Sequence, residues 1–137
     1  MKDALLAAVS APELNTATVA ALADWQAERV PGYRALFERR GFNPRTMQHW
    51  LEIPAVFTSA FKRFPLFAGD AVAHAFKTSG TSGASAGVSQ FSKDGLEVMR
   101  EAIRVNAKRM LFPDDQPTAV FVLAPSPQEA PHMIMSW

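Results

Sequence analysis

The feature that most constrains this chain is a run of glycines and hydroxyl side chains between two apolar stretches, at residues 76–92. Its sequence is Phe-Lys-Thr-Ser-Gly-Thr-Ser-Gly-Ala-Ser-Ala-Gly-Val-Ser-Gln-Phe-Ser. Because glycine adopts positive φ readily and allows close approach of a ligand, Gly80, Gly83 and Gly87 predict tight turns. The hydroxyl donors of the run are Thr78, Ser79, Thr81, Ser82 and Ser85. The flanking apolar stretches predict a strand on each side, and hence a loop that is rigidly held.

Such a loop could bind phosphate, because consecutive backbone N–H groups in a turn converge on an anion. Lys77 adds a positive charge at the start of the run. A flexible linker has a similar composition, and composition alone leaves that alternative open. Two common nucleotide motifs do not match: the chain has no Gly-Lys-Ser/Thr tripeptide, and its glycines lack the G-x-G-x-x-G spacing.

The hexapeptide Thr78-Ser79-Gly80-Thr81-Ser82-Gly83 is similar to TSGTTG, the phosphate-loop motif of the adenylate-forming enzymes. Upstream, the segment from Ile53 to Lys62 resembles the one that precedes this loop in phenylacetate-CoA ligases and in the acyl-protein synthetases of bacterial bioluminescence. The resemblance covers residues 50–125. Many members continue with x-Pro-Lys, whereas this chain has Ala84-Ser85-Ala86 and lacks the loop lysine. A small hydroxyl residue near that point is typical of the acyl-protein synthetases.

This resemblance implies an α/β fold: a helical N-terminal region, then part of a mixed or parallel sheet with a crossover helix, as the incomplete N-terminal portion of such an enzyme. It implies an acid–thiol ligase that uses ATP and Mg²⁺ to activate a fatty or aryl acid as an acyl-adenylate. The acyl group then passes to a thiol acceptor, either coenzyme A or a protein cysteine. The implied nucleotide-binding residues are Thr78, Ser79, Gly80, Thr81, Ser82 and Gly83.

Family members are much longer, and their adenine site, carboxylate site and lid lysine come after the part that residues 1–137 resemble. The chain is therefore expected to be a truncated, inactive portion of the enzyme, with no catalytic residue of its own assigned. An alternative of another class stays open, in which the chain is a small non-catalytic interaction domain with a flexible Ser/Gly loop. The apolar end from Pro131 to Trp137 would then mediate association.

Composition excludes several other classes. With 14 basic and 13 acidic residues, the net charge of +1 gives no field to attract nucleic acid. No apolar stretch approaches the ~20 residues of a membrane span, and Asp3 argues against a signal peptide, so a cytoplasmic location is expected. The absence of cysteine excludes disulfides and a covalent thioester on this chain. A hydrophobic content of 48% is enough for one partial domain with a core.

Residue periodicity predicts a mainly helical portion at 1–52 and an α/β portion at 53–137 that contains the phosphate-binding loop at 77–87. The helices are expected at 3–9, from Pro12 to about Val30, from Pro31 to Gly41, from Asn43, and from Ser92 to Met110. Residues 118–124 are apolar without alternation, which predicts a strand buried on both faces. A strand that follows a helix indicates a right-handed crossover and a parallel sheet.

Other candidate residues have plainer interpretations. His49, His74 and His132 lack the spacing of a metal site, so we expect surface or half-buried imidazoles and no metal. Core packing explains an aromatic set better than an acyl pocket does. That set is Trp50, Phe57, Phe61, Phe64, Phe67 and Phe76. Lys62 is expected to be exposed, although it could lie near the phosphate, and Asp114-Asp115 predicts a turn.

Overall fold

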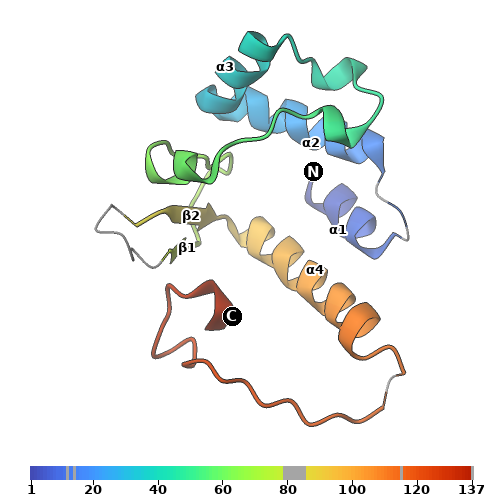
Figure 1. Ribbon diagram of the computed structural model, residues 1–137, viewed down its shortest axis with the longest axis vertical. Coiled ribbons are helices and arrows are strands. Elements are labelled where there is room, and N and C mark those ends of the chain that lie inside the picture. Colours follow the sequence, from blue (N-terminus) through green and yellow to red (C-terminus); the bar gives the residue numbers. More distant parts are fainter. Residues whose placement is uncertain (12, 14, 79–85, 115, 137) are drawn as a thin grey trace.

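The computed structural model describes residues 1–11, 13, 15–78, 86–114 and 116–136 (Figure 1). Its α-helices are α1 (Lys2–Ser10), α2 (Thr16–Arg29), α3 (Pro31–Arg40) and α4 (Lys93–Leu111), and its strands are β1 (His74–Lys77) and β2 (Val88–Phe91). Short 3-10 helices lie at η1 (Pro44–Thr46), η2 (Trp50–Glu52), η3 (Thr58–Lys62) and η4 (Ile134–Ser136). The predicted order, helices first and then helix with strand, is confirmed at this coarse level. None of the described helices combines the length and apolarity needed to cross a bilayer.

Local capping chemistry sets the helix boundaries. The Asn15 side chain accepts hydrogen bonds from the backbone N–H groups of Ala17 and Thr18, at 2.9 and 3.3 Å. This cap starts α2 at Thr16, so the predicted start at Pro12 was wrong. The predicted boundaries of α3 are confirmed, because Pro31 occupies its first turn and Gly41 ends it at φ 60°.

The helices form two groups. In Figure 1, α1 lies alongside α4, while α2 and α3 form the upper layer in that view. The Lys2 ammonium ties α1 to α4 through Glu97 at 3.1 Å, and Arg45 ties η1 to α2 through Asp24 at 2.8 Å. Both ion pairs are at the surface and add little stability, so apolar packing must hold the groups together.

The buried apolar side chains of the described residues are few, and of these only Val30 is fully buried. They are Ala23, Val30, Phe37, Met47, Phe76 and Leu96. Phe37 meets Phe42 edge to face at 4.8 Å between ring centroids, and Phe76 meets Phe91 at 5.4 Å. Such pairs add stability beyond the burial of their area.

The predicted aromatic core is only partly formed. Phe76 is buried, as expected, but Trp50, Phe57, Phe61 and Phe64 are exposed by 40, 83, 38 and 60%. The prediction was therefore wrong for these four residues. They lie on a connector of 3-10 turns, which has no regular face to press against a layer.

The sheet is a two-stranded antiparallel hairpin. Its register pairs His74 with Phe91 and Lys77 with Val88, so the strands predicted on either side of the glycine run are confirmed. Within the described ranges no further strand joins them, and the predicted parallel pairing and crossover do not form. Residues 118–124 are not a buried strand, because Leu123 is fully exposed and Phe121 is 89% exposed. A strand that is apolar on both faces needs neighbouring strands and a covering layer, and the described chain offers neither.

The amphipathic helix α4 provides a test of where the core lies. Leu96 is 7% exposed on α4 and Met110 is 74% exposed on the same helix. We expect Leu96→Ala to lower the free energy of unfolding by about 2–5 kcal/mol, because it leaves a cavity. The matched substitution Met110→Ala should change it by less than about 0.5 kcal/mol. Urea denaturation followed by circular dichroism measures both, and equal losses would contradict this account of the core.

Candidate functional site

The hairpin closes the glycine and hydroxyl run at a defined neck. Thr78 donates its backbone N–H to the Gly87 carbonyl at 2.9 Å, and Gly87 donates its N–H to the Thr78 Oγ1 at 2.8 Å. These two bonds continue the β1–β2 ladder past Lys77 and Val88 and fix both ends of the intervening segment. The predicted site residues Ser79, Gly80, Thr81, Ser82 and Gly83 lie outside the described residues.

Thr78 is the one predicted ligand residue whose place is described. Its hydroxyl oxygen accepts from the Gly87 N–H and lies 3.5 Å from the Gly87 carbonyl oxygen. This geometry gives Thr78 a structural task, closure of the neck, in addition to any contact with phosphate. The sequence pattern of hydroxyl residues and glycines did not predict that Thr78 closes the neck.

Gly87 fits into the neck because it has no side chain. Its φ is not positive, in contrast to Gly41, so the expectation of a positive-φ turn at Gly87 was wrong. A Cβ atom at Gly87 would lie 3.2 Å from the Thr78 Oγ1 and 3.6 Å from the Lys62 Cγ. Because Gly87 is also buried, this close packing is the physical reason for glycine here.

Two lysines flank the neck. The aliphatic stem of Lys62, at the end of η3, reaches Gly87, and the side chain as a whole is exposed. Lys77 is exposed at the last position of β1, one residue before Thr78. The structure therefore brings Lys62, which is distant in sequence, to the base of the loop. Two cations at one end of the hairpin favour an anionic ligand there.

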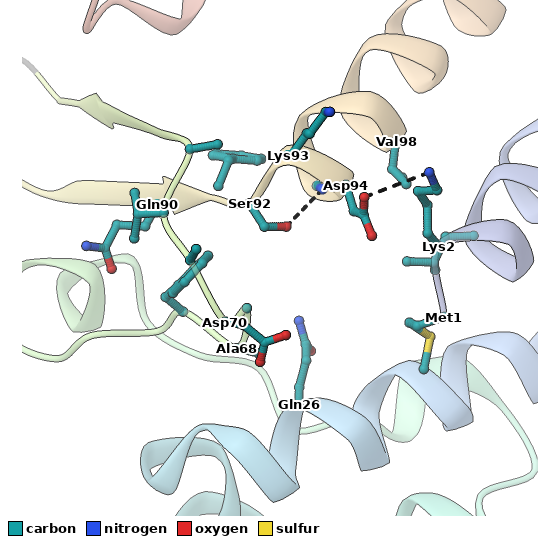
Figure 2. A pocket seen from close by; sticks show the side chains of 18 of the residues that line it. Met1, Lys2, Gln26, Ala68, Asp70, Gln90, Ser92, Lys93, Asp94 and Val98 are labelled. Atoms are coloured by element: carbon teal, nitrogen blue, oxygen red, sulfur yellow. Dashed lines mark hydrogen bonds and ion pairs between the residues drawn. The ribbon is translucent and has the colours of Figure 1, made fainter.

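A cleft of about 510 Å³ lies at the other end of β2. It is lined by the start of α1, the C-terminal half of α2, the connector 66–73, the end of β2 and the start of α4 (Figure 2). Gln90 and Phe91 of β2 line the cleft, and only Val88 and Ser89 lie between them and the neck, so Gly87 and Gln90 are about 10 Å apart along the strand. The cleft and the loop are therefore neighbouring features on one hairpin.

The cleft combines apolar walls with a few polar groups. Trp25, Phe67 and Phe91 are among its apolar lining residues. In Figure 2 the side chains of Gln26 and Asp70 point toward each other. The Ser92 hydroxyl caps α4 by accepting from the Gly95 N–H at 3.0 Å, as the sequence predicted. A space of this size and lining suits a small, partly apolar molecule.

The charged side chains on the α1 side of the cleft form ion pairs with one another. Lys2 bonds to Glu97 at 3.1 Å and lies 3.8 Å from Asp94. The hydrogen bond to Glu97, aided by the charges of Glu97 and Asp94, raises the pKa of Lys2. This lysine therefore stays charged at neutral pH and is engaged by α4.

Two of the three histidines lie together, which the sequence did not predict. The rings of His74 and His132 are 6.1 Å apart. His74 Nε2 lies 2.7 Å from the Pro131 carbonyl, and His132 Nδ1 lies 2.9 Å from the Ala75 carbonyl, so each nitrogen serves as a donor. The Lys77 N–H completes the contact by donating to the His132 carbonyl at 2.9 Å. The histidines thus fasten residues 131–132 to β1.

The remaining polar candidates have structural tasks. His49 Nδ1 accepts from the Leu51 N–H at 3.1 Å and caps η2. Asp114 accepts from the Gln116 N–H at 3.3 Å, which agrees with the predicted turn, while Asp115 lies outside the described residues. Across the described ranges, no three His, Cys, Asp or Glu side chains gather as a metal site.

Comparison of the chain with protein-family models, with curated proteins and with solved structures returns no match. Any functional conclusion must therefore come from the residues and their geometry.

The neck provides a test of the role of Thr78. Thr78→Val removes the acceptor for the buried Gly87 N–H, which should cost about 1–3 kcal/mol. We expect the Gly87 amide to exchange its hydrogen about 5- to 150-fold faster in this variant, because each 1.4 kcal/mol corresponds to a factor of ten. Thr78→Ser keeps the hydroxyl and should exchange at nearly the original rate. Amide exchange measured by NMR would refute the closure if both variants behave like the unchanged chain.

Proposed function

We propose that this chain supplies the triphosphate-binding loop of an ATP-dependent acid–thiol ligase. The ligase would join a fatty or aryl acid to ATP, release pyrophosphate, and pass the acyl group from the adenylate to a thiol of coenzyme A or of a protein. The proposal is supported by the similarity of residues 78–83 to the phosphate loop of the adenylate-forming enzymes. The observation that carries it is the closed neck between Thr78 and Gly87, which suits a loop held for a ligand better than a loose linker.

The chemistry of this step requires stabilisation of negative charge. When the carboxylate attacks the α-phosphorus, charge builds on the departing pyrophosphate. Backbone N–H groups and hydroxyls aimed at that charge lower the barrier, because they are positioned before the reaction. In the proposal, Ser79, Thr81 and Ser82 donate to the phosphates, while Gly80 and Gly83 permit close approach.

Two lysines near the neck, Lys62 and Lys77, are candidates to replace the positive charge of the missing loop lysine. The sequence has Ala84-Ser85-Ala86 where many relatives of the motif carry x-Pro-Lys. Lys62 reaches the neck from η3, and Lys77 adjoins it from β1. We propose that these two ammonium groups supply the positive charge that the loop itself lacks. A lysine can bind phosphate as a point charge without a fixed planar geometry.

Magnesium would enter with the nucleotide. The described residues hold no cluster of carboxylates and imidazoles for it. Mg²⁺ is commonly bound by substrate phosphates with only one or two protein carboxylates, so the proposal requires no such cluster. In the proposal, other parts of a cytoplasmic enzyme bind the adenine and the carboxylic acid and supply the lid lysine.

A direct test removes two hydroxyls from the loop. Thr81→Ala with Ser82→Ala should weaken binding of Mg·ATP and of magnesium pyrophosphate by about 100-fold or more, because hydrogen bonds to charged groups contribute about 1.5–3 kcal/mol each and two are lost. The swap Thr81→Ser with Ser82→Thr keeps both hydroxyls and should bind within about threefold of the original. Calorimetric titration measures both affinities.

The same two variants can be assayed in a polypeptide that also carries the adenine and acid sites. ATP–pyrophosphate exchange, tested with a panel of fatty and aryl acids, should fall about 100-fold or more in the alanine variant and persist in the swap. Absence of exchange with every acid, or unchanged exchange in the alanine variant, would overturn the proposal.

A second candidate function is an interaction domain. The observation in its favour is the exposed apolar surface of the C-terminal third, where Val120, Phe121 and Leu123 are exposed by 63, 89 and 101%. Such patches commonly mark association surfaces. Nucleotide titration separates the two candidates, since an interaction domain needs no affinity for magnesium pyrophosphate.

A further inference from the structure

Residues 131–132 cover the outer edge of β1, the side that faces away from β2. In Figure 1 the chain returns from the far end of α4 to lie beside the hairpin. The Ala75 carbonyl accepts from His132 Nδ1 at 2.9 Å, and the Lys77 N–H donates to the His132 carbonyl at 2.9 Å. An open strand edge would leave such backbone groups for another strand or for water. His132 satisfies both groups, and its imidazole N–H serves as the backbone N–H of a neighbouring strand would.

A second contact holds the same segment from β1. His74 Nε2 donates to the Pro131 carbonyl at 2.7 Å, and the His74 ring lies 6.1 Å from the His132 ring. The His74 ring also lies 4.6 Å from the ring of Phe76, which is only 3% exposed. The attachment of the C-terminal segment therefore extends to the buried centre of the hairpin.

Local hydrogen bonds shape residues 126–133. Ala130 donates its N–H to the Ser126 carbonyl at 2.9 Å, and Met133 donates its N–H to the Ala130 carbonyl at 3.0 Å. Pro131, between these turns and His132, has a fixed φ. These restrictions lower the conformational entropy that the segment loses when it docks on β1.

The docked segment and the neck meet at consecutive residues of the chain. Lys77 donates its N–H outward to His132, and Thr78 donates its N–H inward to the Gly87 carbonyl at 2.9 Å. The neck lies just past the end of a strand of four residues. Strand ends open at little cost when few contacts hold them, and a two-stranded hairpin alone is marginally stable. A bond that fixes Lys77 from the outer side therefore restricts the residue from which Thr78 reaches Gly87.

We propose that His74 and His132 are positioning residues for the neck. By docking residues 131–132 on the outer edge of β1, they keep the contact between Thr78 and Gly87 closed, and undocking of the segment opens it. The effect on the neck follows from the hydrogen bonds of β1. Its consequence for phosphate affinity rests on the proposed function.

Paired substitutions at His132 separate the donor nitrogen from the bulk of the ring. His132→Asn keeps an N–H donor bonded to Cγ, as Nδ1 is, whereas His132→Leu fills space without a donor. Loss of one hydrogen bond should make the Gly87 amide exchange about 2- to 10-fold faster in His132→Leu. The Gly87 amide of His132→Asn should exchange within about twofold of the original rate. Amide exchange measured by NMR gives both rates.

His74 allows the same comparison at the other nitrogen. His74→Gln keeps a donor at the distance of Nε2 from Cγ, and His74→Leu removes it. His49→Leu is the matched control, because His49 caps η2, and it should leave the Gly87 amide unchanged. The Ala23 amide in α2 reports whether a variant loosens the whole chain. The proposal fails if Gly87 exchanges at the original rate in both leucine variants, if Ala23 accelerates as much as Gly87, or if the amide variants behave like the leucine variants.

Titration with magnesium pyrophosphate tests the consequence for the ligand. His132→Leu should bind it about 2- to 10-fold more weakly than the unmodified chain, and His132→Asn within about twofold. Coupling between two sites is reciprocal, so pyrophosphate should slow exchange of the Lys77 amide. If the unmodified chain binds no pyrophosphate, the proposed function fails and amide exchange still decides the positioning role. Equal binding by His132→Leu, with unchanged exchange at Gly87, would overturn the positioning role alone.

Discussion

The pairing of β1 with β2 is the interaction on which the other parts depend. The hairpin carries the glycine and hydroxyl run at one end and borders the cleft at the other, and α4 begins two residues after β2 ends. On the outer side of β1, Pro131 and His132 dock through the two histidine rings. An isolated two-stranded hairpin is only marginally stable in water. Its contacts with α4 and with the returning C-terminal segment are therefore part of what maintains it.

Sequence reasoning succeeded where a local rule decides the structure. Pro31 and Gly41 delimit α3, and Ser92 caps α4, because proline, left-handed glycine and hydroxyl caps act within one turn of the chain. The strands beside the glycine run were also predicted from a local feature, the apolar residues that flank the run. These successes explain why the mixed helix-and-strand class could be predicted.

Sequence reasoning failed where distant contacts decide the structure. The exposed aromatics of the connector and the exposed span at 118–124 look like core residues by composition alone, and only the absence of covering layers shows otherwise. At the candidate site, the approach of Lys62 to Gly87 and the contact of His74 with His132 join residues far apart in the chain. No periodicity marks such pairs. The hydrogen bond between Thr78 and Gly87 could not be predicted either. A threonine hydroxyl in a polar run can bond to a ligand or to the backbone, and the sequence does not distinguish the two.

The attachment of residues 131–132 to β1 brings the C-terminal segment next to the neck. Lys77 donates its N–H to the His132 carbonyl, and the next residue along the chain, Thr78, closes the neck. The donors of the two contacts are therefore consecutive backbone N–H groups at the end of β1. A displacement of β1 at this point would disturb the attachment of the C-terminal segment and the neck together.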